Sequence, residues 1–361
     1  MGDLFEILRA RGATLAGPGG ERTPRHFGDP RGEYHAATDS CGVVHRADRR
    51  LLRVHGRAPR QMLHGILTNR IPEPPAEVGA TLAGEAVYGA ILTPRGRMVT
   101  DLVTLWLGAG EGEGLGLDVA TGGYAAVLEH FKRFLPPRFA RVDDLGERTG
   151  LLTVVGPGAE GVVEGAFGQA PAVGYALAGG GPASDGVLLA CGVEQVPSWN
   201  VWAPVGRMAE WWCRLEDAGA AAVGLGVWET LRIEAGLPAF GVDMDGTTIP
   251  VEAGLVERAF DHDKGCYTGQ EVIVRIRHRG RVNWHLRVLR FGAAAPVPGD
   301  QLFEAGGARV RGRVTSVAQS PRFGQAIGLG YVRREVAPPA TLRLGDGSGT
   351  EVGVEECPER R

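Results

Sequence analysis

The series of short strands and glycine turns that begins near residue 286 constrains the fold of this chain more than any other feature. Four apolar stretches suited to strands follow one another there, each bounded by turn residues: 286–291, 309–317, 326–332 and 341–344. Such a series is typical of a small closed β structure. We therefore expect residues 286–361 to form a C-terminal β-barrel domain.

Residues 1–285 instead mix helical and strand patterns. The spacing of apolar residues predicts a helix over 124–135 and another around 208–215, with strands at 51–54, 151–155, 187–191 and 199–203. A chain of 361 residues is long enough for two or three domains. We expect the fold class to be α+β, with residues 1–285 forming one module of two interleaved subdomains that packs tightly on the barrel.

Charge and cysteine usage exclude several classes of protein. The formal net charge is −3, which argues against a dedicated nucleic-acid binder, although a local basic patch stays open. The five cysteines are widely spaced, without a C-x-x-C pair or a zinc or iron–sulfur ligand spacing, so we expect neither a disulfide framework nor a metal site. No segment suggests a signal peptide or a membrane span, and we expect a cytoplasmic protein.

A carboxylate in an apolar row marks the first candidate site. Residues 86–107 predict a β-hairpin with its turn at 94–96, and alternation on the second strand places Asp101 among the apolar residues of one face. Burying an unpaired carboxylate is costly, so Asp101 should be paired, hydrogen-bonded or at the wall of a cleft. The alternative is a polar residue at the surface end of a strand.

A second candidate lies at a helix end stopped by glycine and proline, residues 231–238. Trp228 and Arg232 are one turn apart on one face of this helix. Together they suit a flat polar heterocycle, which the ring stacks on and the guanidinium hydrogen-bonds. A stacked Arg/Trp pair at the surface is the alternative.

A third candidate is the octet K-G-C-Y-T-G-Q-E at 264–271, followed by an arginine-rich stretch to Arg281. Glycines on both sides of Cys266 suggest a tight loop, and Lys264 would favour a reactive thiolate. Only two lysines occur in the chain, against an excess of arginine, which draws attention to this one. We predict that Arg275, Arg277 and Arg279 alternate on one strand face suited to a polyanion. A core cysteine and a solvated arginine face are the alternatives.

The octet resembles the signature of YgfZ-type folate-binding proteins. Further segments resemble the wider glycine-cleavage T protein (aminomethyltransferase) superfamily and follow in the expected order: 33–37, 92–96, 231–238 and 312–316. The resemblance covers nearly the whole chain and implies a three-domain ring around a central cleft that holds tetrahydrofolate, with a C-terminal β-barrel.

The resemblance also implies a function and a set of site residues. The function would be a tetrahydrofolate-binding accessory protein that supports iron–sulfur cluster assembly or repair, with an effect on tRNA modification, and its partners would be iron–sulfur proteins or cluster-assembly factors. Cys266, Lys264 and Asp101 would carry the chemistry. The residues implied in folate binding are Asp101, Trp228, Arg232, Glu234, Tyr267, Gln270, Glu271, Arg275 and Arg279.

Departures from the superfamily pattern bear on the choice of function. Aminomethyltransferases carry an Asp-Asp pair where this chain has Thr100-Asp101, an Ala-Arg-Asp run where it has 227–229, and a glutamate where it has Asn200. Two other functions stay open: a folate-dependent aminomethyltransferase or related one-carbon transfer enzyme, and an RNA- or protein-binding module without catalysis that uses the patch 275–281.

Overall fold

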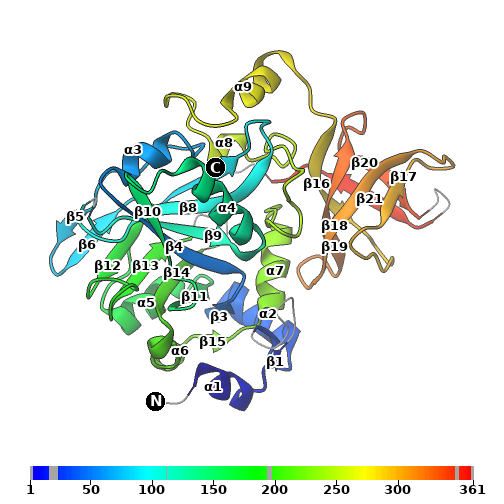
Figure 1. Ribbon diagram of the computed structural model, residues 1–361. Coiled ribbons are helices and arrows are strands. Elements are labelled where there is room, and N and C mark those ends of the chain that lie inside the picture. Colours follow the sequence, from blue (N-terminus) through cyan, green and yellow to red (C-terminus); the bar gives the residue numbers. More distant parts are fainter. Residues whose placement is uncertain (1–2, 16–22, 111, 193–196, 346–348, 359–361) are drawn as a thin grey trace.

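The computed structural model describes residues 3–15, 23–110, 112–192, 197–345 and 349–358. Within these ranges the chain forms two large sheets, a closed barrel and surrounding helices (Figure 1). A small sheet near the N-terminus pairs β1 (Thr14–Leu15) with β2 (Pro24–His26).

The first large sheet has five strands and carries the predicted hairpin. Its strands, in spatial order, are β10 (Ala140–Asp144), β4 (Arg49–Gly56), β9 (Leu115–Ala120), β8 (Met98–Trp106) and β7 (Val87–Leu92). Every residue of β8 is buried. The predicted hairpin is confirmed, since β7 and β8 pair antiparallel with Ala90 opposite Asp101.

The second large sheet has eight strands. In spatial order they are β15 (Ala221–Ala222), β3 (Gly42–Arg46), β11 (Thr149–Val155), β14 (Ser198–Pro204), β13 (Val187–Cys191), β12 (Tyr175–Ala178), β6 (Thr81–Gly84) and β5 (Ala76–Val78). The main apolar cluster joins Leu102 and Trp106 of the first sheet to Tyr175 and Trp202 of the second. Packing between the two sheets therefore forms the largest core.

The helices cover the sheet faces and link the two modules. The helical elements are α1 (Leu4–Ala10), α2 (Pro30–Asp39), α3 (Pro59–His64), η1 (Thr121–Gly123), α4 (Tyr124–Phe134), α5 (Ala159–Phe167), η2 (Val205–Arg207), α6 (Met208–Asp217), α7 (Leu225–Glu234), α8 (Val256–Ala259) and α9 (Gln270–Arg279). Asp3 caps α1, its side chain accepting a hydrogen bond from the amide of Phe5. In the described part of the chain, no helix is long and apolar enough to cross a membrane.

The C-terminal module is the predicted β-barrel. Its strands close in the order β16 (Trp284–Arg290), β19 (Gln325–Arg333), β18 (Val310–Ser320), β17 (Gln301–Phe303), β20 (Ala340–Leu344) and β21 (Glu351–Glu355). The sequence analysis missed β17 and β21, which have only three and five residues. The α+β fold class with a C-terminal barrel is confirmed, while the domain boundary at 285/286 stays a prediction.

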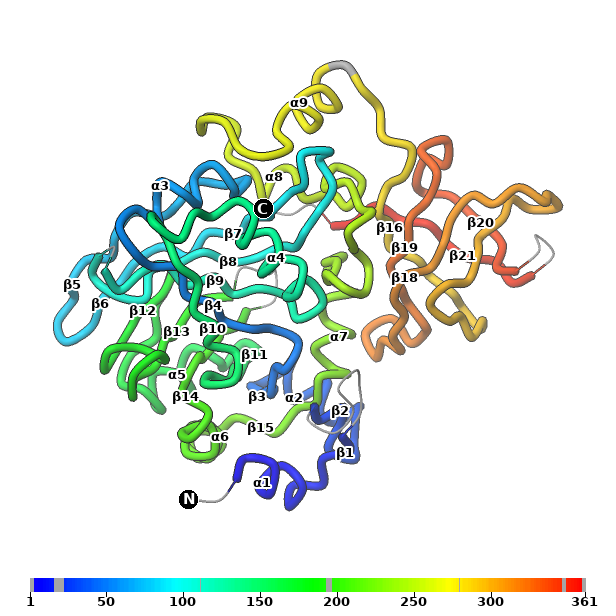
Figure 2. The backbone as a smooth tube through the Cα atoms, viewed as in Figure 1, coloured from blue at the N-terminus to red at the C-terminus, as the bar shows by residue number. Residues whose placement is uncertain are grey.

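Helix α7 lies between the sheets and the barrel (Figures 1 and 2). Its Ile233 joins an apolar cluster of the barrel strands, and its Leu231 packs with Tyr34 of α2. Gly236, at φ 69°, adopts the left-handed conformation that ends the helix. One face of α7 therefore packs against the N-terminal module and another face packs against the barrel.

The predicted arginine strand is wrong, because the segment forms helix α9. Ile273 and Ile276 follow the three-residue spacing of a helix, and Ile273 is buried in an apolar cluster. Successive residues on a helix are turned by about 100°, so Arg277 points away from the face that positions 275 and 279 share. Three guanidinium groups on one face therefore do not occur here.

Candidate functional site

A cavity of about 120 Å³ lies where the two sheets meet α7 and the segment 237–242. Most of its polar lining is charged, with both signs present. The charged lining residues are Arg46, Asp48, Arg49, Asp101, Asp118, Glu229, Arg232 and Arg258. The cavity thus brings Asp101 of β8 together with Trp228 and Arg232 of α7, which lie more than a hundred residues away in the sequence.

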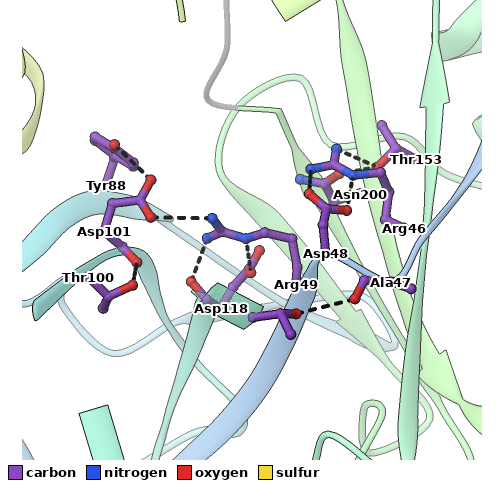
Figure 3. A network of polar contacts seen from close by, with 11 residues as sticks. Arg46, Ala47, Asp48, Arg49, Tyr88, Thr100, Asp101, Asp118, Thr153 and Asn200 are labelled. Atoms are coloured by element: carbon purple, nitrogen blue, oxygen red, sulfur yellow. Dashed lines mark hydrogen bonds and ion pairs between the residues drawn. The ribbon is translucent and has the colours of Figure 1, made fainter. Parts of the chain in front are cut away.

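Asp101 projects from the centre of β8 and is 5% exposed. Its Oδ2 accepts a hydrogen bond of 3.0 Å from the hydroxyl of Tyr88 (Figure 3). Its Oδ1 lies 3.6 Å from Arg49 Nη1 and, among the described residues, has no hydrogen-bond donor. The predicted buried and paired position is confirmed, and one carboxylate oxygen remains able to accept a hydrogen bond.

Arg49 stands between two buried carboxylates. Its Nε donates to Asp118 Oδ1 at 2.7 Å, while Nη1 faces Asp101. Burial opposes the guanidinium charge, but Asp118 and Asp101 outweigh it and raise the pKa of Arg49. The Arg49 guanidinium is therefore held between the carboxylates of Asp101 and Asp118.

A second polar chain lines the cavity on the side of the eight-stranded sheet. Arg46 forms a two-pronged ion pair with Asp48, at 2.7 and 2.8 Å, and donates to Thr153 at 3.5 Å. The hydroxyl of Thr153 donates to Asn200 Oδ1 at 2.8 Å (Figure 3). The Arg46 guanidinium also lies 4.2 Å from the ring centroid of Trp228, so it covers a face of that ring.

The guanidinium of Arg232 donates hydrogen bonds to acceptors within the protein. It donates to Glu229 at 2.5 Å and 2.8 Å, to Asp243 at 2.7 Å and to the carbonyl of Leu237 at 3.1 Å. Asp243 in turn accepts a hydrogen bond from Thr315 of the barrel. Arg232 therefore ties α7 to the segment that walls the cavity and, through Asp243, to the barrel.

Glu234 lies outside the cavity. It accepts hydrogen bonds from the hydroxyl of Tyr34, at 2.9 and 3.0 Å, and from Ser320 of the barrel at 2.5 Å. Burial and this carboxylate raise the pKa of Tyr34. The carboxylate thus joins α2, α7 and the barrel at their common junction.

Lys264 fastens its loop to the segment that follows α3. Its Nζ donates to the carbonyls of His64, Leu67 and Asn69 at 2.9, 2.6 and 2.9 Å. Burial lowers the pKa of Lys264 to about 8. The neighbouring Tyr267 is buried and packs against Phe260, and burial raises the pKa of its phenol to about 12.

The rest of the octet also lies away from the cavity lining. Cys266 is exposed. Gly269, at φ 84°, lets the backbone approach Thr93, because a Cβ there would lie 2.6 Å from its carbonyl oxygen. The predicted tight loop is confirmed, but the backbone that Gly269 approaches closely is that of Thr93. Its functional role stays a prediction.

Helix α9 carries the remaining predicted residues. Gln270 begins the helix, and Glu271 and Arg275 form an exposed ion pair at 3.0 Å. The side chain of Arg279 lies outside the described part of the structure. These positions do not join Asp101, Trp228 and Arg232 at the cavity.

The sequence analysis missed most of the polar residues around Asp101. Asp118 carries the same signal that marked Asp101, a carboxylate within the apolar strand β9. Arg49 and Tyr88 carry no such signal, because neither residue type is unusual in a strand with these neighbouring residues. Among the described residues, no cluster of histidine, cysteine, aspartate and glutamate side chains is arranged to hold a metal ion.

Comparison with known proteins places this architecture in a family. Residues 4–264 match the model of the GCVT N-terminal domain, and residues 281–355 match that of the glycine cleavage T-protein C-terminal barrel domain. The chain therefore belongs to the glycine cleavage T-protein family, as the sequence resemblance to the superfamily predicts.

Similar proteins match over almost the full length. The aminomethyltransferase of Rubrobacter xylanophilus is 28% identical, with 98% of this chain and 90% of the relative covered, and that of Nitrosomonas europaea is 26% identical, covering 91% and 88%. The crystal structure of glycine cleavage system aminomethyltransferase T from Bartonella henselae has a TM-score of 0.82 at 20% identity, covering 99% and 96%. The latter likeness establishes the shared fold.

Proposed function

We propose that this chain binds tetrahydrofolate, with the edge of the pterin ring in the central cavity. The observation that carries the proposal is Asp101 Oδ1, a buried carboxylate oxygen at the cavity wall for which the described residues supply no hydrogen-bond donor. The pyrimidine half of a pterin presents adjacent N–H groups, and a carboxylate accepts hydrogen bonds from such groups. An unsatisfied buried acceptor is costly, which gives the ligand a source of affinity.

The size of the cavity sets a condition on binding. At about 120 Å³ it is smaller than the roughly 300 Å³ at which sites for drug-sized ligands begin. A bicyclic ring therefore enters fully only when lining side chains move.

For the role of the bound folate, we infer a YgfZ-type accessory protein that supports iron–sulfur enzymes. The octet 264–271 supports this role, together with the exposed position of Cys266. The partners would be iron–sulfur proteins or cluster-assembly factors, and the site of action the cytoplasm. The replacement of expected polar residues by Thr100, Trp228 and Asn200 supports a function other than aminomethyl transfer.

A folate-dependent aminomethyltransferase is the second candidate. The family match and the relatives named aminomethyltransferase favour it, since they cover nearly the whole chain. Asp101 would then orient the folate amine toward the aminomethyl donor. An RNA- or protein-binding module is the third candidate. It would bind tRNA in a salt-sensitive manner, and added folate would not change this binding.

Three assays test the proposal and separate these functions. Isothermal titration calorimetry with tetrahydrofolate tests binding, and absence of heat at all protein concentrations would overturn the proposal. Turnover of an aminomethylated lipoyl carrier with tetrahydrofolate would establish the transferase. Complementation of iron–sulfur enzyme activity in cells lacking the native protein, without such turnover, would establish the accessory role.

A further inference from the structure

A second cavity, of about 530 Å³, lies between the N-terminal module and the barrel. None of its described lining residues also lines the central cavity between the two sheets. Its volume falls within the range of pockets that hold small molecules. The lining residues are Arg97, Thr247, Thr248, Ile249, Glu252, Asn283, Trp284, Gln301, Val310, Gly312, Arg313 and Tyr331.

Backbone hydrogen bonds fix the loop that walls this cavity. The amide of Met98 in β8 donates to the carbonyl of Thr248 at 3.0 Å. The amide of Leu286 in β16 donates to the carbonyl of Glu252 at 2.9 Å. The loop that carries Thr248 and Glu252 is therefore tied to the N-terminal module at one point and to the barrel at another, so the cavity is built into the fold.

Tyr331 and Arg313 lie directly opposite each other on β19 and β18 of the barrel. Opposite residues of paired strands point to the same face of a sheet, and both of these line the cavity. Tyr331 is 8% exposed, and its hydroxyl oxygen has no hydrogen-bond partner among the described residues. Burial raises the pKa of this phenol, so the hydroxyl stays protonated and can donate a hydrogen bond.

Two guanidinium groups dominate the charge of the cavity. Neither Arg97 nor Arg313 forms an ion pair with another described residue, and both are exposed. Arg97 donates to the carbonyl of Thr247, which leaves further N–H groups of its guanidinium available. Among the described lining residues Glu252 is the one carboxylate, and burial raises its pKa. The lining therefore favours a ligand of negative charge.

We propose that this cavity binds a small organic anion, whose carboxylate or phosphate oxygens accept hydrogen bonds from the guanidinium of Arg313 and the hydroxyl of Tyr331. A guanidinium binds such groups with two parallel N–H donors. Arg97 adds positive charge from the N-terminal module, and Trp284 offers ring surface to the rest of the ligand. The bound anion would thus contact both modules.

The test uses probes of similar shape that differ in charge. Dissociation constants of benzoate, phenyl phosphate and the neutral benzamide are measured by NMR titration of the full chain. At least one of the two anions should bind more tightly than benzamide, and the ratio of their affinities tells a carboxylate site from a phosphate site. Equal affinities for benzamide and both anions would overturn the inference.

Variants locate the binding. Arg313→Gln and Tyr331→Phe should each weaken binding of the preferred anion roughly 10–100-fold, the loss expected for a hydrogen bond to a charged group. Arg141→Gln changes an exposed arginine of β10 outside the lining and should have no effect. Asp101→Asn should also leave anion binding unchanged, because Asp101 lines the central cavity.

The hydroxyl of Tyr331 allows a test without ligand. Tyr331→Phe removes a buried hydroxyl that lacks a partner, so the urea midpoint of the unliganded protein should stay the same or rise. Tyr175→Phe is the matched control, since the hydroxyl of Tyr175 accepts a hydrogen bond of 3.2 Å from the amide of Trp106 and its loss should lower the midpoint. A clear fall in Tyr331→Phe would show that this hydroxyl serves the fold and would overturn its role in binding.

The remaining outcomes separate this inference from folate binding. Failure of both anions to bind at up to about 10 mM, or binding that is unchanged in Arg313→Gln, would overturn the inference. Because the two cavities have separate linings, either result leaves the proposed function standing. Loss of anion binding in Asp101→Asn would place the anion in the central cavity and would also overturn the inference.

Discussion

Asp101 and Arg49 form a buried ion pair whose closest atoms, Oδ1 and Nη1, are 3.6 Å apart, too far for a hydrogen bond. Arg49 instead directs its hydrogen bonds to the carboxylate and carbonyl of Asp118. The charge of Asp101 is thus partly compensated while one oxygen keeps its capacity to accept. A cavity wall built in this way favours a ligand with N–H donors.

Replacing the Asp101 carboxylate should weaken folate binding. Asp101→Asn keeps the shape but substitutes a donor for an acceptor, and we expect a loss of about 1–3 kcal/mol in the binding free energy of tetrahydrofolate. Calorimetry measures it, with the exposed Asp185→Asn as the matched control. Unchanged affinity in Asp101→Asn would remove Asp101 from the site.

The two lysines of the chain should differ sharply in their effect on stability. Lys264→Met leaves three backbone carbonyls without their shared donor, and we expect the free energy of unfolding to fall by about 2–4 kcal/mol. Lys132 is exposed and lies 3.7 Å from Glu129, so Lys132→Met should change it by less than about 0.5 kcal/mol. Urea denaturation gives both values, and equal losses would contradict the role of Lys264.

Cys266 should be alkylated faster near neutral pH than Cys41, Cys191 and Cys213. Its side chain is exposed, whereas burial raises the pKa of Cys41 to about 11 and also raises the pKa values of Cys191 and Cys213. A thiol reacts as its thiolate, so these three should lag. Peptide mass spectrometry after timed iodoacetamide treatment measures the rates. Faster modification of Cys41 than of Cys266 would refute this ordering.

Arg275 should contribute little to folate affinity. It is exposed, pairs with Glu271 on α9 and is not part of the cavity lining. We expect Arg275→Gln to change the binding free energy of mono- and triglutamyl tetrahydrofolate by less than about 0.5 kcal/mol at low salt. A selective loss of triglutamate affinity, reduced by added salt, would show that this helix reads the glutamate tail after all.

Local patterns in the sequence predicted much of the framework. The hairpin around Asp101 follows from two strand-like stretches on either side of the turn at 94–96, and the barrel follows from repeated short strands between glycine turns. In α6, the spacing of Met208, Trp211, Trp212 and Leu215 predicted a buried helix face, and all four side chains are buried. The strand predicted for the arginine stretch of α9 was wrong. Its charged residues alternate as in a strand, but the spacing of the apolar residues Ile273 and Ile276 is that of a helix.

The candidate site shows where local information ends. By sequence alone, Asp101 could be identified because a carboxylate in an apolar strand needs compensation. Its partners Arg49, Tyr88 and Asp118 come from three other strands, and only the register of the five-stranded sheet brings them together. Likewise, Lys264 stood out by its rarity, but its acceptors lie about two hundred residues away in sequence.

The sequence therefore determined the hairpin, the presence of the barrel and the need to compensate Asp101, because apolar periodicity and the cost of burying charge act within a few residues of chain. Tertiary structure alone decided that Asp101 and Asn200 line one cavity, that Lys264 binds carbonyls and that Arg275 lies away from this cavity on α9. Hydrogen bonds and ion pairs require atoms within about 3–4 Å, and only the packing of distant segments fixes which atoms come that close.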